Sequence, residues 1–335
     1  MNQINSFHEL ENYQPQAAKM LHHGFKENRL SHAYIFEGPK GTHKRATAFL
    51  FAARLLCQQP NENDEPCGVC ANCHRIQHGM HPNVFLIEAD GEQIKKDQIK
   101  QLINEFSKMA LEDGPRIYII DEAHRMNQDA SNTLLKQMEE PSQSIYAILL
   151  TTNANALLKT IVSRAQIIHF KPISRKKIHD ELIHDGVDEL RASLIPEYTN
   201  NIEEASKIAQ SKDLMPLLDL VIQLYALLET KESSLIIRFR EMADKVMASS
   251  TNMDFFLTMM ILYQKDILNY QLRHHQTINY STELKTITWL ASHVSQKTVQ
   301  EMLETMLTLK LRFRYNLNFN LVWDELIAQL ERKMH

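Results

Sequence analysis

The amino-acid sequence predicts an α/β core followed by a mostly helical C-terminal half, and three observations support this fold class. In the first half, short apolar runs alternate with helical patterns, as in the right-handed crossovers of a parallel sheet. Beyond about residue 172, apolar residues recur three and four positions apart. Only 8 of the 335 residues are glycine, which agrees with long, uninterrupted helices.

The composition is that of an ordinary globular protein, with 44% hydrophobic residues, 23% charged residues and a net charge of −4. The length is sufficient for two or three domains. The net charge gives no overall attraction for nucleic acid, so a DNA contact would need a local basic patch. No stretch approaches 18 apolar residues, and the first residues are polar. We therefore expect a soluble, cytoplasmic protein without a membrane-spanning segment.

The expected core covers residues 1–171. It begins with two helices between residues 4 and 29, and its strands are predicted at 31–36, 83–88, 116–121, 145–151 and 166–170. Helices at 44–57, 96–109 and 127–139, and a short one near 156, separate the strands. Ligands of a parallel sheet bind beyond the carboxyl ends of its strands. The loops after Phe36, Asp121 and Thr151 should therefore lie at one edge.

The remaining chain is predicted to be helical. Helices at 175–185, 188–195 and 202–210 are too short for more than a small lid, which we place at 172–212. A third, all-helical domain is expected at 213–335. Its helices are predicted at 216–228, 234–247, 253–272, 284–292, 298–315 and 320–334.

The stretch "FEGPKGTHKR" occupies the place of a phosphate-binding loop, between the first strand and its helix. That loop needs glycine at its sixth position and serine or threonine at its eighth, but here they are His43 and Arg45. The histidine brings a side chain where the backbone must wrap closely round phosphates. The arginine is a permanent cation that cannot ligate magnesium.

The other loop residues are retained, because Gly38, Gly41 and Lys44 stand at their expected positions. A lysine at a helix N-terminus can still attract an anion. We therefore predict a vestigial nucleotide site that binds ATP weakly or not at all and does not hydrolyse it productively. The alternative is an ordinary strand–turn–helix corner in which glycine and proline serve the turn.

Two acids and an amide continue the pattern at later strand ends. In "IYIIDEAH", Asp121 and Glu122 stand where an ATPase holds magnesium and orients the attacking water. Asn153, after the next strand, stands where a polar sensor of the terminal phosphate would lie. Taken alone, the acids would be read as a solvated acidic turn. Their order after Lys44 favours the vestigial site.

Arg164 follows Ser163 at the end of a short predicted helix. Such an arginine is often a surface or capping residue. In a ring of subunits it can instead stabilise charge on the ATP of a neighbour, as an arginine finger supplied in trans. We place Arg164 in that role because the other motifs precede it in the same order.

The four cysteines of the chain fall within seventeen residues, as C-x9-C-x2-C-x2-C: Cys57, Cys67, Cys70 and Cys73. In a reducing compartment this clustering favours a metal over disulfides. Four thiolates close a tetrahedral shell, so we predict structural Zn²⁺ in a module at 57–73. The alternative is a set of unligated buried cysteines. We expect the nearby His74, His78 and His81 to be surface residues.

Four segments together resemble one known family: "RLSHAYIFEGPKG", "CGVCANC", "IYIIDEAHRMNQDASNTLLKQMEEPSQSIYAILLTTN" and "IVSRAQIIHF". Over residues 10–170 they are similar to the clamp-loader branch of the AAA+ family. The resemblance implies an α/β AAA+ core with an inserted zinc module, a small helical lid and an all-α collar. In that family the collar joins five subunits into an open ring.

The resemblance also implies a function. The chain would be a non-motor clamp-loader subunit of DNA polymerase III, acting in DNA replication. Its partners would be the other loader subunits, gamma or tau and delta, in a heteropentamer. Through the complex it would meet the sliding clamp and primed DNA. The four zinc cysteines carry over directly, and Arg164 remains from a Ser-Arg-Cys motif whose cysteine is here Ala165.

Two alternatives stay open. The preserved Asp121 and Glu122 would suit an active ATP-hydrolysing subunit of gamma or tau type, or a related AAA+ replication or recombination ATPase. Against this, the lid segment "TNNIEEASKIAQ" lacks a glycine turn and an arginine able to sense phosphate. A DNA-binding adaptor would use the basic residues 175–177 and the run Lys310, Arg312 and Arg314.

Overall fold

The computed structural model describes residues 4–107, 112–139, 145–230, 235–243, 250–312 and 319–334. The chain forms two compact units, Met1–Ile173 and Ser174–His335. Each unit has its own hydrophobic core. The further division of the second unit into a lid and a collar at residue 212 stays a prediction.

The first unit is built on one sheet of five parallel strands in the order β2-β3-β4-β1-β5. This confirms the predicted parallel sheet. In β1, Glu37 lies beside Thr151 of β4 and His169 of β5, so the carboxyl ends of these strands meet at one edge. The strands are β1 (Ala33–Glu37), β2 (Val84–Ile87), β3 (Arg116–Ile120), β4 (Ile145–Thr151) and β5 (Gln166–His169).

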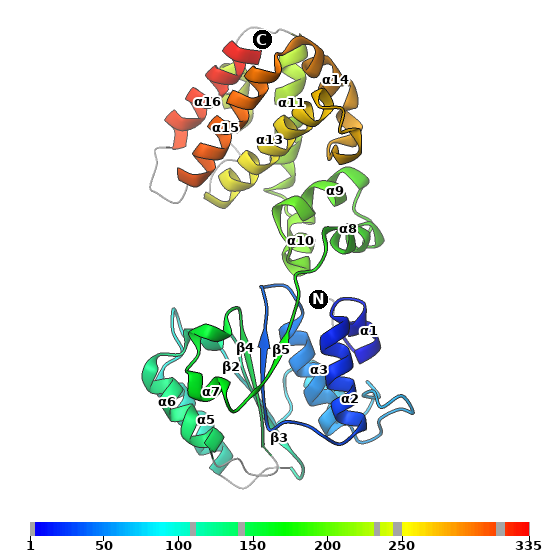
Figure 1. Ribbon diagram of the computed structural model, residues 1–335, viewed down its shortest axis with the longest axis vertical. Coiled ribbons are helices and arrows are strands. Elements are labelled where there is room, and N and C mark those ends of the chain that lie inside the picture. The colour runs from blue at the N-terminus through cyan, green and yellow to red at the C-terminus, as the bar shows by residue number, and fades with distance from the viewer. Residues whose placement is uncertain are drawn as a thin grey trace. The chain divides into compact units, whose positions relative to one another are not determined.

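Helices cover both faces of this sheet (Figure 1). Alternate residues of β1 point to opposite faces, as a strand requires. Tyr34 and Phe36 join the core under α1, α2 and α3, whereas Ala33 and Ile35 join the core under α5, α6 and α7. The bounds are α1 (Phe7–Glu11), α2 (Pro15–Lys26), α3 (Lys44–Leu56), α5 (Lys96–Ser107), α6 (Gln128–Glu139) and α7 (Lys159–Val162).

Three short elements complete this unit. Helix α4 (Ala71–Gln77) packs on α3 and was not predicted, because seven residues in a cysteine-rich stretch show no helical period. The 3-10 helix η1 (Ala123–Arg125) follows β3. The helix expected near residue 156 is resolved into the 3-10 helix η2 (Ala154–Ala156) and α7.

The described residues of the second unit are helical and contain no strand. The first three helices each begin after a side chain that caps the free N–H groups: Ser174, Asp188 and Asn201. The elements are α8 (Arg175–His184), α9 (Glu189–Tyr198), α10 (Ile202–Ala209), α11 (Met215–Thr230), α12 (Leu235–Ala243), α13 (Ser250–Gln271), η3 (His275–Thr277), η4 (Ser281–Glu283), α14 (Leu284–His293), α15 (Gln296–Arg312) and α16 (Phe319–Met334).

Aromatic rings fill the core between the long helices of this unit. Tyr225 of α11 and Tyr263 of α13 stack with ring centroids 4.0 Å apart, and Tyr280 packs on Tyr263. All three are fully buried. Within the described ranges, no helix has the length and apolar character needed to cross a bilayer.

Candidate functional site

The loop between β1 and α3, predicted to be a vestigial phosphate-binding loop, has a close backbone approach and two positions with positive φ. A Cβ at Gly38 would lie 2.3 Å from the carbonyl oxygen of Phe170, so only glycine fits there. Gly41 has a φ of 72° and His43 a φ of 62°, both in the left-handed region that favours glycine. The buried ring of His43 packs edge-on against Tyr13, with the centroids 4.7 Å apart.

The side chain of Lys44 turns back onto this loop. Its Nζ donates to the carbonyl oxygens of Gly38 at 2.7 Å and Pro39 at 2.5 Å, and lies 3.4 Å from Thr42 Oγ1. Burial lowers the pKa of Lys44 to about 8, and the charge of Asp121 only partly opposes this shift. The ammonium group that would bind phosphate in an ATPase is therefore engaged by loop carbonyls.

Arg45 extends from the first turn of α3 to the ends of two strands. Its Nη1 lies 3.3 Å from Asp121 Oδ2, after β3, and also contacts Glu88 Oε1, after β2. The other oxygen of Asp121 accepts the backbone N–H of Glu122 at 2.9 Å. The carboxylate predicted to hold magnesium is thus neutralised by a guanidinium of the same chain.

Glu122 is held in the same way. Its Oε1 lies 2.7 Å from Lys40 Nζ and its Oε2 lies 2.8 Å from Arg125 Nη1. Hydrogen bonds from Lys40 and then Arg125 lower the pKa of Glu122 to about 2. Its backbone has a φ of 48°, which few non-glycine residues adopt. The acid predicted to orient water is therefore also paired within the chain.

At the end of β4, Asn153 is exposed and caps η2: its Oδ1 accepts the N–H of Asn155 at 2.9 Å. The hydroxyl of Thr151 lies 3.3 Å from His124 Nδ1 and donates to the carbonyl of Asn153 at 3.0 Å. The amide oxygen of Asn153 is thus used as a helix cap. The role of Asn153 as a phosphate sensor remains a prediction.

Arg164 lies directly after Ser163, the C-terminal cap of α7. Its Nη1 donates to the carbonyl of Thr160 at 3.0 Å, and its Nη2 lies 3.2 Å from Glu139 Oε1. The side chain is 37% exposed and Glu139 is 45% exposed. Such a pair is weak because water competes for both charges, so the guanidinium can exchange Glu139 for another anion.

The four predicted cysteines are brought together in space: the sulfur atoms of Cys57, Cys67, Cys70 and Cys73 all lie within 4.8 Å of one another. Cys67 Sγ and Cys73 Sγ are 4.0 Å apart. Zinc with bonds to sulfur of about 2.3 Å would separate its ligands by about 3.8 Å. Four thiols at this spacing can bind a metal ion, and the fit is close to that of a tetrahedral thiolate site.

Backbone N–H groups point at these sulfurs in sequence, from Cys67 to Cys57 at 3.3 Å, Cys70 to Cys67 at 3.3 Å and Cys73 to Cys70 at 3.5 Å. Burial alone would raise the pKa of Cys70. Hydrogen bonds from the backbone of Cys73 and Gln58 outweigh it and lower the pKa to about 6. Donors of this kind stabilise a thiolate ligand.

The segment between the first two cysteines is tied to the N-terminal helix. The buried carboxylate of Glu65 accepts the N–H groups of Phe7 at 2.7 Å and His8 at 3.0 Å, in the first turn of α1. His22 of α2 shares a hydrogen bond of 2.7 Å with the carbonyl of Asn63. The cysteine module therefore holds α1 and α2 in position.

One prediction about this module is wrong. His74 and His78 are exposed as expected, but His81 is buried, with 3% of its surface exposed. Its Nδ1 accepts the N–H of Asn83 at 3.1 Å, and its Nε2 lies 3.8 Å from Glu112 Oε2. It anchors the chain where it enters β2, and burial lowers its pKa.

Three residues of the corner were missed by the sequence analysis: Lys40, Glu88 and Arg125. Their ion-pair partners lie 82, 43 and 3 residues away, so local sequence patterns do not reveal most of these pairs. The available signal was the basic character of the loop, at positions 40, 44 and 45, opposite acids predicted at strand ends.

Comparison with known proteins gives consistent matches. Residues 13–174 match the family model described as DNA polymerase III, delta subunit. DNA polymerase III subunit delta' of Bacillus subtilis (strain 168) is 34% identical over 97% of this chain and 98% of its own length. DNA polymerase III subunit tau/gamma of Haemophilus influenzae is 34% identical over 49% of this chain and 24% of its own length. A gamma subunit-related protein of Thermotoga maritima, a solved structure, aligns at 16% identity with a TM-score of 0.47, covering 96% of this chain and 100% of that one.

Proposed function

Because the chain belongs to the family of delta-prime subunits of DNA polymerase III, we propose that it works in the clamp loader as a subunit that hydrolyses no ATP itself. It takes part in DNA replication by helping to load the sliding clamp onto primed DNA. Its partners are the gamma or tau and delta subunits of a heteropentamer. We place this function in the cytoplasm.

The observation that carries the non-motor role is the internal neutralisation of both acids. Arg45 pairs with Asp121, and Lys40 and Arg125 pair with Glu122. Hydrolysis needs magnesium on the first acid and a free second acid beside the attacking water. Arg45 stands where the magnesium-binding hydroxyl would be, so it removes a ligand and adds a competing cation. The chain does not meet these requirements, which argues against the alternative of an active ATPase.

The share of this subunit in ATP chemistry lies in Arg164. A guanidinium aimed at the phosphates of a neighbouring ATP stabilises the charge that develops during phosphoryl transfer. Arg164 is partly exposed, and its one carboxylate partner among the described residues is the exposed Glu139. This weak pair positions the side chain without committing it, which suits a group that must reach across an interface.

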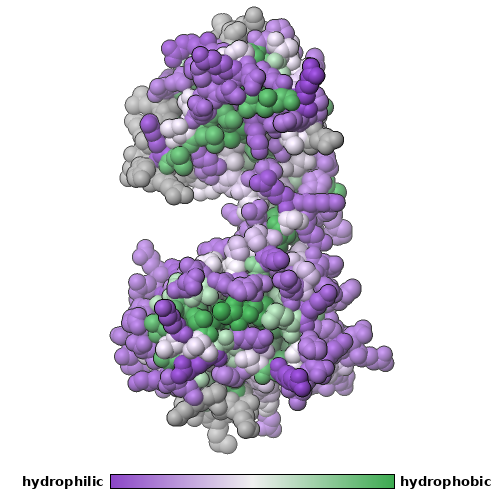
Figure 2. Space-filling model, viewed as in Figure 1, coloured by the Kyte–Doolittle hydropathy of each residue, from purple (hydrophilic) through white to green (hydrophobic). Residues whose placement is uncertain are grey.

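The collar role is supported by apolar surface on the second unit. Leu307 and Leu311 of α15 are 45% and 71% exposed and stand one helical turn apart on the same face. A strip of apolar atoms crosses this unit on the face shown in Figure 2. Exposed apolar surface of this kind marks protein contacts, and we assign it to the neighbouring loader subunits.

The cysteine cluster is proposed to hold one structural Zn²⁺. All four positions of a tetrahedral shell are taken by Cys57, Cys67, Cys70 and Cys73, so the ion has no open position for catalysis. Bound zinc would fix the end of α3, the start of α4 and, through Glu65, the start of α1. Its contribution is therefore to stability.

The finger assignment is tested with Arg164→Ala in the reconstituted loader. We expect DNA-stimulated ATP hydrolysis to fall at least about tenfold, since an arginine finger contributes roughly 10³-fold or more where it is essential. Assembly, measured by gel filtration, should be unchanged. Arg191→Ala is the matched control, because Arg191 is 36% exposed and also pairs with one acid, Asp188.

Unchanged hydrolysis in the Arg164→Ala complex would remove the finger role but leave the family assignment intact. A titration of the isolated wild-type chain with fluorescent ATP tests the remaining alternative, an active ATPase. We expect no magnesium-dependent binding. Tight binding with turnover would mean that the ion pairs of Arg45 and Lys40 open, and would establish an active ATPase.

A further inference from the structure

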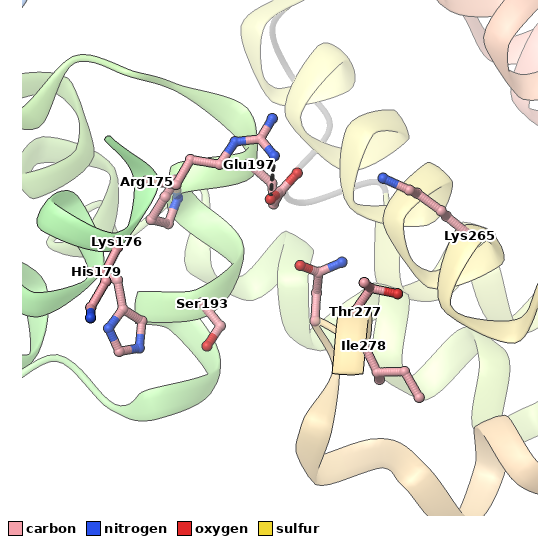
Figure 3. A pocket seen from close by; sticks show the side chains of 10 residues that line it. Arg175, Lys176, His179, Ser193, Glu197, Lys265, Thr277 and Ile278 are labelled. Atoms are coloured by element: carbon pink, nitrogen blue, oxygen red, sulfur yellow. Dashed lines mark hydrogen bonds and ion pairs between the residues drawn. The ribbon is translucent and has the colours of Figure 1, made fainter. Parts of the chain in front are cut away.

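The second unit contains a cavity of about 420 Å³ that none of the roles above uses (Figure 3). It lies between α8 and α9 on one side and α13 with the segment after η3 on the other. Its lining residues are mostly polar or charged: Arg175, Lys176, His179, Ser193, Pro196, Glu197, Lys265, Thr277, Ile278 and Asn279. The volume is within the range of small-ligand sites.

The charge of the lining is strongly positive. Arg175 and Lys176 of α8 line the cavity together with Lys265 of α13, and Glu197 is the one acid among the lining residues. Glu197 Oε1 lies 2.7 Å from Arg175 Nη1. Within the described ranges, no carboxylate lies at ion-pair distance from Lys176 or Lys265. The lining therefore carries a net positive charge, although Glu197 offsets Arg175 and the neighbouring Asp266 offsets part of the charge of Lys265.

His179 adds to this character. Burial alone would lower its pKa, but hydrogen bonds with Asp180 at 3.3 Å and Glu189 at 3.0 Å raise it. The negative charges of these two acids balance the positive charge of protonated His179. They do not neutralise Lys265, which is contributed by a different helix.

The opposite wall is rigid. Buried Asp266, next to Lys265, accepts the backbone N–H of Asn279 at 2.8 Å and its side-chain amide at 3.1 Å. The hydroxyl of Thr277 donates to the carbonyl of His274 at 2.9 Å. These bonds hold Thr277, Ile278 and Asn279 in place, so the cavity has a defined shape and does not depend on an unsupported loop.

The start of α8 has an electrostatic cost that an anion would relieve. Residues 175–177 place three cations in the first turn, at the positive end of the helix dipole. The cap is Ser174, which is neutral. Basic residues in a first turn disfavour the helix unless a negative group is near. An anion in the cavity would lie near Arg175 and Lys176 at the start of α8, with Lys265 on the other wall.

We propose that this cavity binds a compact polyanion carrying two or more phosphate groups. One phosphate would contact Lys176 and Arg175 at the start of α8, and the second would contact Lys265 across the cavity, with Ser193 as a hydroxyl donor. A concave space of this size suits a small ligand better than a DNA duplex, which needs an extended surface. We thus assign the basic residues 175–177 to a small phosphorylated ligand, whereas the sequence alone left DNA open as their partner.

Titration calorimetry with pyrophosphate in magnesium-free buffer tests the site in the full-length chain. Lys176→Ala with Lys265→Ala should weaken binding at least about tenfold, because each variant removes a charged donor to the ligand. Both lysines are exposed, so folding should be preserved. The matched control, Lys207→Ala with Lys285→Ala, removes two exposed lysines of the same unit and should change binding less than twofold.

Two further measurements decide the alternatives. If Lys40→Ala abolishes pyrophosphate binding and the double variant does not, the ligand binds at the β1–α3 loop and the proposal fails. If a single-stranded oligonucleotide binds more tightly than pyrophosphate and is lost in the double variant, the ligand is a DNA backbone and the proposed class is wrong. Undetectable pyrophosphate binding at millimolar concentration also overturns the proposal.

Discussion

At the scale of single residues, Arg45 determines the chemistry of the corner. A hydroxyl at this position would ligate magnesium, whereas the guanidinium pairs with Asp121, the acid predicted to hold magnesium, and with Glu88. Arginine keeps its charge at every relevant pH. The positive charge beside Asp121 is therefore present without a nucleotide.

Glu122 provides a prediction about pH. Its folded-state pKa, about 2, lies below the ordinary value of 4.5. The ion pairs with Lys40 and Arg125 therefore contribute stability above pH 4.5, and this contribution is lost as the pH falls toward 2. Glu122→Gln should reduce the free energy of unfolding at pH 7 by about 1 kcal/mol or less, because the pairs are partly exposed.

Urea unfolding of both proteins at pH 7 and pH 3 measures this effect. The difference between wild type and Glu122→Gln should shrink at pH 3. Glu62→Gln changes an exposed acid of the same unit and serves as the control, with no difference expected at either pH. A difference of equal size at both pH values would contradict the role of the ion pairs.

At the scale of elements, the cysteine module acts as a staple between helices. Cys57 ends α3, Cys70 caps α4, and Glu65 between them caps α1. The segment 57–70, which has little regular structure, thus contacts three helices. Metal in the cluster would add to the apolar core that already holds α1 and α3.

Two changes to the module should have related effects. Glu65→Ala leaves the buried N–H groups of Phe7 and His8 without an acceptor, which costs about 1–3 kcal/mol. Chelation should release about one zinc per chain and loosen the same contact. Hydrogen exchange of the Phe7 and His8 amides should accelerate in both cases, and Glu62→Ala should leave it unchanged. A metal-free protein with wild-type exchange would contradict the staple.

At the scale of the whole molecule, the chain consists of two units with separate cores. Both faces of the sheet are covered within residues 1–173, because one core lies under α1, α2 and α3 and the other under α5, α6 and α7. The second unit buries its own aromatic cluster around Tyr263. Neither core needs residues from the other unit.

We therefore expect a fragment of residues 1–173 to fold alone. It should show one cooperative thermal transition by circular dichroism and bind about one zinc per chain. A fragment of residues 1–165 lacks β5, which pairs with the edge of β1, and should lose cooperativity. A fragment 1–173 without a cooperative transition would show that the first unit depends on the second.

Much of the fold was predictable because it depends on local patterns. The strand at 145–151 is a continuous apolar run, and the helix at 202–209 buries apolar residues three positions apart, as expected. The missed α4 is too short to show a period, and the burial of His81 depends on its contacts with Asn83 and Glu112. Parts of the site followed from residue chemistry, since four cysteines at this spacing suit only a few roles.

By itself, the sequence determined the parallel sheet, the helical second half, the cysteine cluster and the loss of the loop's glycine and hydroxyl. Only the tertiary structure decided which charges meet. Arg45 pairs with acids 43 and 76 residues away, and Arg175 and Lys265 line one cavity from separate helices. The physical reason is range: periodicity and turn chemistry act between chain neighbours, whereas an ion pair forms only where the packing of distant elements brings two side chains within a few ångströms.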